Sequence, residues 1–117
     1  MATDLVGNVK LQRFIQLLSD LNHQTADVFS SGKTEILKDM NETILEMYSI
    51  QHTGEEDAYT AIEEDCQIIY KNFNAIITMM ESNESIFIDN ATNVAVKKFL
   101  QNIFDANIRI LAAYGLI

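Results

Sequence analysis

Proline is absent from this sequence, and its 117 residues contain only four glycines, two histidines and one cysteine. A single cysteine cannot form an internal disulfide. No run of eighteen or more apolar residues occurs, so the sequence predicts no membrane-spanning helix. The first residues lack the basic region, the apolar core and the cleavage site of a secretory signal, and we therefore expect a cytoplasmic protein.

Basic residues are also few. Eight lysines and arginines stand against seventeen aspartates and glutamates, which gives a net charge of −9. This surplus of negative charge repels the phosphates of nucleic acids and the surfaces of anionic membranes. We therefore expect no nucleic-acid partner and no membrane partner, and a charged protein partner should be basic.

The two histidines, His23 and His52, do not occur in the patterns of a metal or heme site. Paired Glu-x-x-His motifs hold metal ions in many helical bundles, but the residues three places before these histidines are Asp20 and Ser49. No cysteine pair precedes a histidine, as heme attachment would require. Cys66 lies within an apolar pattern, where a thiol behaves as a small hydrophobe. The sequence therefore predicts no cofactor, no metal and no catalytic residue.

The clearest positive feature is a regular spacing of apolar residues. Between residues 59 and 80 the steps alternate strictly between three and four: Tyr59, Ile62, Cys66, Ile69, Phe73, Ile76 and Met80. This alternation keeps one stripe of a helix facing a neighbour at a shallow crossing angle, as in left-handed coiled coils and four-helix bundles. The same spacing occurs in residues 11–28, 37–51 and 96–113.

Glycines mark the ends of the periodic segments. Gly32, Gly54 and Gly115 follow them, where a left-handed residue commonly closes a helix. We expect one domain, residues 1–117, with helices at about 8–30, 34–52, 55–81 and 90–114. Short connections make successive helices antiparallel, so the predicted fold is an all-α up-down-up-down four-helix bundle with left-handed packing. A weaker alternative is a bundle built from two helical hairpins of two chains.

The last predicted helix carries a second apolar stripe. Phe104, Ile108 and Leu111 are spaced i, i+4 and i+7 on another side of it. A helix that is apolar on most sides is usually buried, yet no helix of a four-helix bundle is central. We therefore expect homodimerisation through this stripe, with Ile68 of the third helix contributing. The alternatives are a groove for a target protein and a rotated helix in which Phe104 and Leu111 belong to the core.

Two acidic triplets form a candidate patch on the third predicted helix. They are eight residues apart, and their members are Glu55, Glu56 and Asp57, then Glu63, Glu64 and Asp65. Eight residues are slightly more than two helical turns, so both triplets lie on about the same side. Such residues are usually a solvated face, but a patch of one sign can also contact a basic partner.

These features favour binding over catalysis. The sequence predicts a small acidic cytoplasmic protein-binding module of the adaptor, chaperone, immunity or inhibitor type, which acts through helix surfaces as a homodimer. Its partner would be another protein, basic or amphipathic. The alternative is a ligand-binding or sensing bundle whose internal apolar cavity is surrounded by Met40, Met47, Phe73, Met79 and Met80.

Overall fold

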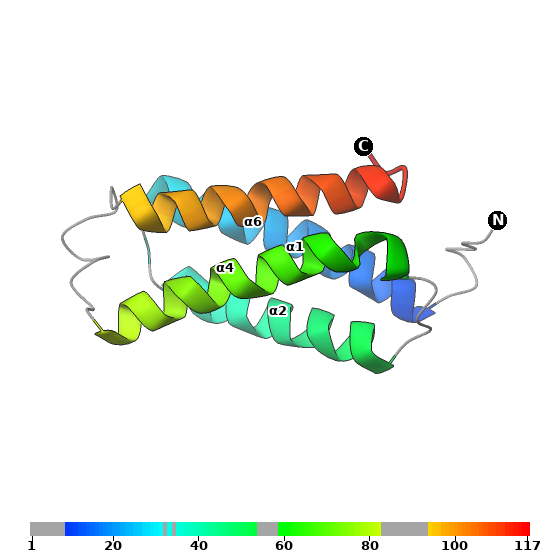
Figure 1. The fold of residues 1–117 in the computed structure, drawn as a ribbon, viewed down its shortest axis with the longest axis horizontal. Coiled ribbons are helices and arrows are strands. Elements are labelled where there is room, and N and C mark those ends of the chain that lie inside the picture. Colours follow the sequence, from blue (N-terminus) through cyan, green and yellow to red (C-terminus); the bar gives the residue numbers. More distant parts are fainter. Residues whose placement is uncertain (1–8, 32, 34, 54–58, 83–93) are drawn as a thin grey trace.

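A computed structural model describes residues 9–31, 33, 35–53, 59–82 and 94–117 of the chain. The helices are α1 (Val9–Ser31), α2 (Glu35–Thr53), the short 3-10 helix η1 (Thr60–Ile62), α4 (Glu63–Ser82) and α6 (Val94–Ala113). Their number and class confirm the predicted helical bundle, and no strand occurs in these ranges. Successive long helices run in alternating directions (Figure 1). The left-handed sense of their packing stays a prediction.

The ends of the helices agree with the prediction to within a residue wherever the structure describes them. The predicted first turn of the third helix and the predicted start of the fourth helix fall in residues 54–58 and 83–93, outside the described residues. At the end of α6, Gly115 has a φ of +74°. Its N–H donates to the carbonyl of Ala112, and the N–H of Leu116 donates to that of Leu111. This pair of bonds is a Schellman cap, as expected for Gly115. Gly32 and Gly54, the other two expected helix stops, lie outside the described residues.

The predicted stripes form the core of the bundle. In the third helix the stripe is buried from Tyr59 to Ile76. In α1 all six stripe positions are buried: Leu11, Phe14, Leu18, Leu21, Thr25 and Val28. Burial is incomplete near the ends of the stripes on α2, α4 and α6. Gln51, Met80 and Phe99 are only half-buried, and Ala113 is exposed. Four buried residues lie outside the predicted stripes: Leu17, Thr43, Leu100 and Asn107.

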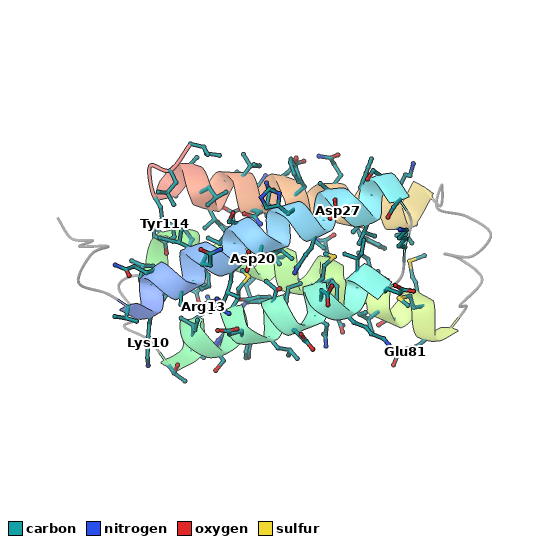
Figure 2. All side chains as sticks on the ribbon, turned by 180° about the vertical axis from the view of Figure 1, so that it is seen from behind. Lys10, Arg13, Asp20, Asp27, Glu81 and Tyr114 are labelled. Carbon is teal, nitrogen blue, oxygen red and sulfur yellow. The ribbon has the colours of Figure 1, made fainter. Side chains whose placement is uncertain are left out.

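The four helices are not equally spaced. Close backbone approaches join α1 to α2, α4 to α6 and α1 to α6, whereas α2 and α4 approach each other less closely. Figure 2 shows α1 from behind, lying between α6 and α2. The bundle therefore has a closed side between α1 and α6 and, opposite to it, a more open side between α2 and α4.

Polar side chains connect each adjacent pair of helices. Asn107 Nδ2 of α6 donates to the Leu18 carbonyl of α1 at 2.8 Å, and Asn102 Nδ2 of α6 donates to Asn72 Oδ1 of α4 at 3.0 Å. Across the open side, the Tyr70 hydroxyl of α4 donates to an amide oxygen of α2, Gln51 Oε1, at 2.7 Å. The register between helices is thus held by hydrogen bonds as well as by apolar packing.

Candidate protein-interaction surfaces

The closed side of the bundle carries a shallow apolar hollow of about 220 Å³ between α1 and α6. None of its lining residues is charged, and they are Thr25, Ala26, Phe29, Leu100, Gln101 and Phe104. Phe29 is 38% exposed, and Lys97 Nζ lies over its ring, 5.2 Å from the ring centroid. An exposed aromatic ring beside an uncharged hollow is typical of a protein-contact surface.

The predicted stripe of the last helix belongs to this side. Phe104 lines the hollow, and Ile108 and Leu111 follow it on the same flank of α6; all three are half-buried. On α1, Ile15 lies three turns before Ala26 and so on the same side of the helix. We call this set the α1–α6 face, and its members are Ile15, Ala26, Phe29, Phe104, Ile108 and Leu111.

The alternative of a rotated last helix, with Phe104 and Leu111 in the core, agrees with the structure only in part. Leu100 is 2% exposed and belongs to the core, although the predicted stripe did not include it. Phe104 and Leu111 keep part of their surface in solvent. They therefore stand at the boundary between the core and the surface, which is where residues of a contact face are expected.

Ile68 does not share the α1–α6 face. It is half-buried and lines a separate hollow between α4 and α6, together with Asn72, Asn102, Asp105 and Arg109. The reason is that one flank of α6 faces α1 while the other faces α4. Ile68 and Phe104 therefore line separate hollows, and the role of all four residues in a contact between copies stays a prediction.

The acidic triplets are only partly available as a patch. Glu55, Glu56 and Asp57 lie outside the described residues. Glu63 and Glu64 are exposed, whereas the Asp65 side chain is 22% exposed and pairs with α6: Arg109 Nε donates to Asp65 Oδ1 at 2.8 Å. Asp65 is thus partly neutralised and contributes less to a binding patch than its two neighbours.

The charge of the chain is distributed unevenly between the two sides of the bundle. Helices α2 and α4 contain eight acidic residues and two lysines, a net charge of −6. Helices α1 and α6 contain three acidic and five basic residues, a net charge of +2. The negative charge is therefore concentrated on α2 and α4, and not only at the start of α4 as the sequence predicted.

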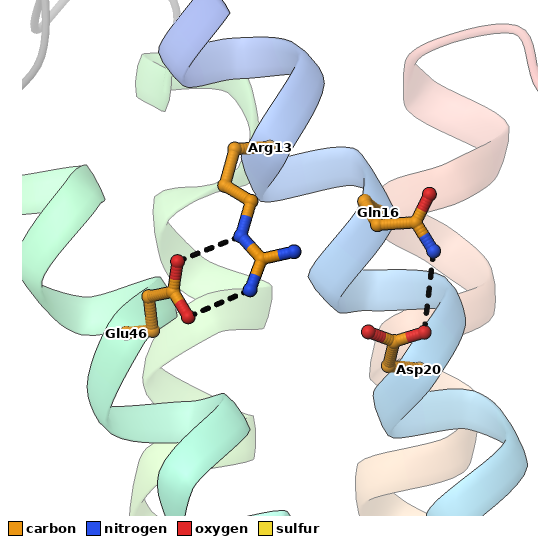
Figure 3. Close-up of polar contacts among 4 residues, drawn as sticks. All are labelled: Arg13, Gln16, Asp20 and Glu46. Carbon is orange, nitrogen blue, oxygen red and sulfur yellow. Dashed lines mark hydrogen bonds and ion pairs between the residues drawn. The ribbon is translucent and has the colours of Figure 1, made fainter.

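The two ion pairs that join described helices follow this division. Arg13 of α1 forms a bidentate pair with Glu46 of α2, its Nε donating to Oε2 at 2.7 Å and its Nη2 donating to Oε1 at 2.9 Å (Figure 3). These hydrogen bonds lower the pKa of Glu46 and raise the pKa of Arg13. In this pair, as in Arg109 with Asp65, the cation comes from the α1–α6 side and the anion from the α2–α4 side.

The open side carries a groove of about 300 Å³ between α2 and α4, which we call the α2–α4 groove. None of its eight lining residues is charged: Asn41, Ile44, Leu45, Tyr48, Tyr70, Phe73, Asn74 and Ile77. Leu45 is 60% exposed and Tyr48 is 48% exposed, although both are large apolar side chains on a helix. A large apolar surface that stays in solvent marks a candidate binding site.

Sequence reasoning missed this groove, although a signal was present. Leu45 and Tyr48 stand three residues apart outside the α2 stripe, and Tyr70 and Ile77 stand seven apart outside the α4 stripe. For α6, a second apolar stripe was taken as a sign of a contact surface. The same criterion applied to α2 and α4 identifies both of these pairs. The opening itself could not be predicted, because it depends on how far apart the two helices lie.

Cys66 and the two histidines, the side chains with possible chemistry, differ in their exposure to solvent. Cys66 is buried, and this burial raises the pKa of the Cys66 thiol to about 12, so the reactive thiolate is disfavoured. His23 and His52 are exposed, and His52 Nδ1 lies 2.9 Å from the Tyr48 carbonyl oxygen. In the part of the chain that the structure describes, no three His, Cys, Asp or Glu side chains converge as metal ligands.

The methionines do not surround either opening. Met40 and Met47 are fully buried in the core, whereas Met79 and Met80 are half-buried against it. Of the five residues expected around an internal cavity, only Phe73 lines the α2–α4 groove, and none lines the hollow between α1 and α6. The ligand-binding alternative stays a prediction.

None of the described helices combines the length and the apolar character that crossing a membrane would require. Comparisons with known proteins gave no match for this chain, whether to a family model, to a curated protein or to a solved structure.

Proposed function

We propose that this chain is a small acidic protein-binding module that self-associates through its α1–α6 face and contacts a second protein through another surface of the bundle. The observation that supports this most directly is the uncharged α1–α6 face, with Phe29 exposed at its edge. A cytoplasmic location and an adaptor, chaperone, immunity or inhibitor role belong to the same proposal, on the grounds of the sequence.

Electrostatics favour the α1–α6 side for self-association. Two chains of net charge −9 repel each other, so a stable contact between copies needs surfaces from which acidic groups are absent. None of the six residues of the α1–α6 face is acidic, and the charged group beside it, Lys97 at the Phe29 ring, is basic. The two helices that carry the face have a net charge of +2. A two-fold dimer through this face would keep the acidic α2–α4 sides apart, because the same surface of each copy is used.

The size of the surface sets the expected strength of the dimer. A helix of 20 residues is about 30 Å long, and two helices packed side by side are about 20 Å wide. The face covers only part of this length, so it can bury at most about 600 Å² on each copy, less than the roughly 800 Å² of a standard stable interface. We expect a dimer that dissociates on dilution instead of an obligate one.

Analytical ultracentrifugation over a range of concentrations tests this proposal. We expect the wild type to shift from monomer to dimer as its concentration rises, and Phe104→Asp to remain monomeric, because a charge on the face cannot be desolvated without a partner. Leu45→Asp is the matched control, since it places the same charge on the opposite side of the bundle. A wild type that stays monomeric at millimolar concentration, or an equal loss of dimer in both variants, would contradict the proposal.

A further inference from the structure

We infer that the α2–α4 groove binds an amphipathic α-helix of a different protein, with its apolar stripe in the groove and basic residues on its flanks. The inference rests on the proposed function, because it assumes a binding module, but it uses the side of the bundle opposite to the self-association face. It commits to a helical, basic partner and not to a second copy of this chain.

The shape of the groove fits a helix. The lining residues of α2 run from Asn41 to Tyr48 and those of α4 from Tyr70 to Ile77, so each wall extends over two helical turns. Two turns are about 11 Å long. A helix laid along such walls presents side chains at i, i+3 or i+4, and i+7, and about three of them can enter the groove.

The chemistry of the walls resembles the centre of a protein interface. Tyrosine and large aliphatic residues dominate, charge is absent, and the amides of Asn41 and Asn74 can bond polar groups of a partner. Tyr48 is held in place before any partner arrives, because its ring stacks on His52 at 3.9 Å and meets the Tyr70 ring edge-on at 5.3 Å. A fixed aromatic anchor reduces the entropy lost on binding.

The charge around the groove selects the partner. On α4 the exposed Glu81 stands one turn beyond Ile77. On α2 the exposed Glu42 follows Asn41 directly, and the exposed Lys38 stands one turn before Asn41. The two helices together carry a net charge of −6. A second copy of the chain would bring two such acidic sides together, which costs free energy. A helix with lysine or arginine on its flanks instead gains attraction from the net negative charge of the two helices, while its apolar stripe fills the uncharged centre.

A synthetic peptide provides the test. The probe is a labelled peptide of about 18 leucines and lysines, with leucine at i, i+3, i+4 and i+7, and its control has the same composition without an apolar stripe. Fluorescence anisotropy with the full chain at about 0.15 M salt should show binding of the striped peptide about tenfold tighter than the control. The double variant Leu45→Ser, Tyr48→Ser should lose about tenfold in affinity for the striped peptide, whereas Phe29→Ser on the opposite side should lose none.

Other results would overturn the inference. Equal binding of both peptides would mean that charge alone is recognised, and a loss confined to Phe29→Ser would place the peptide on the α1–α6 face. Loss of self-association in the groove variant, measured by ultracentrifugation, would assign the groove to a second copy. A monomeric wild type that still binds the striped peptide in its groove would instead refute only the proposed self-association. Circular dichroism of each variant verifies that it is folded.

Discussion

Asn107 gives a sharp test of how the α1–α6 contact is held together. Its side chain has no solvent-exposed surface, and its amide donates to the Leu18 carbonyl at 2.8 Å. Its oxygen, Oδ1, is buried and accepts no hydrogen bond from the described residues. A buried acceptor without a partner costs about 1–3 kcal/mol, whereas an ordinary hydrogen bond contributes about 0.5–1.5 kcal/mol. The Asn107 amide therefore lowers the free energy of unfolding overall.

The perturbation is Asn107→Leu, which keeps the volume of the side chain and removes both polar groups. The Leu18 carbonyl lies inside α1 and keeps the hydrogen bond of its own helix, so it is not stranded. The substitution removes the unsatisfied acceptor Oδ1, which stabilises the fold, and also removes the hydrogen bond to the Leu18 carbonyl, which destabilises it. The first effect is larger, so we expect the free energy of unfolding to rise by about 1 kcal/mol. For a chain of this size the midpoint of thermal unfolding should rise by about 4 °C.

Urea unfolding followed by circular dichroism measures the change. Asn107→Ala is the matched control, because it removes the same polar groups but leaves a cavity, and it should be less stable than Asn107→Leu by about 2 kcal/mol. The reasoning is refuted if Asn107→Leu is less stable than the wild type by 1 kcal/mol or more, since the amide would then contribute more than one hydrogen bond. A more stable variant with a weakened dimer would show that the buried amide sets the register of α1 against α6.

Three further predictions concern single residues. Because burial raises the pKa of Cys66 to about 12, the folded thiol should react with a disulfide reagent at pH 8 only as fast as the protein opens, and the rate should rise sharply in urea. The unfolded thiol ionises near pH 9, so the stability that this residue contributes is complete below pH 9 and decreases as pH rises towards 12. A urea series across this range should show a smaller decrease in Cys66→Ala, in which Tyr70 and Tyr114, whose pKa values burial also raises, still contribute. Gly115→Ala should lower the free energy of unfolding by about 1 kcal/mol, because alanine is strained at a φ of +74°, and Ala112→Gly measures the cost of glycine one turn earlier.

The apolar spacing was sufficient to predict the helices and most of the core, because burial follows the helical repeat. It missed Leu17 and Leu100 because α1 and α6 each pack against two neighbours, so their buried surface is wider than one stripe. The pairing of Asp65 with Arg109, 44 residues later in the chain, could not be predicted without knowing which helices are adjacent. The same holds for the placement of Ile68 away from Phe104.

The separation of charge between the two sides of the bundle has a consequence for assembly. A dimer joined through the α1–α6 faces would carry its two α2–α4 grooves on opposite outer surfaces. Since the bundle is 25 × 21 Å in cross-section, two copies back to back would hold these grooves about 40–50 Å apart. Such a dimer is bivalent: a partner with two suitably spaced basic helices would be retained by avidity, and separate partners would be brought together without touching each other.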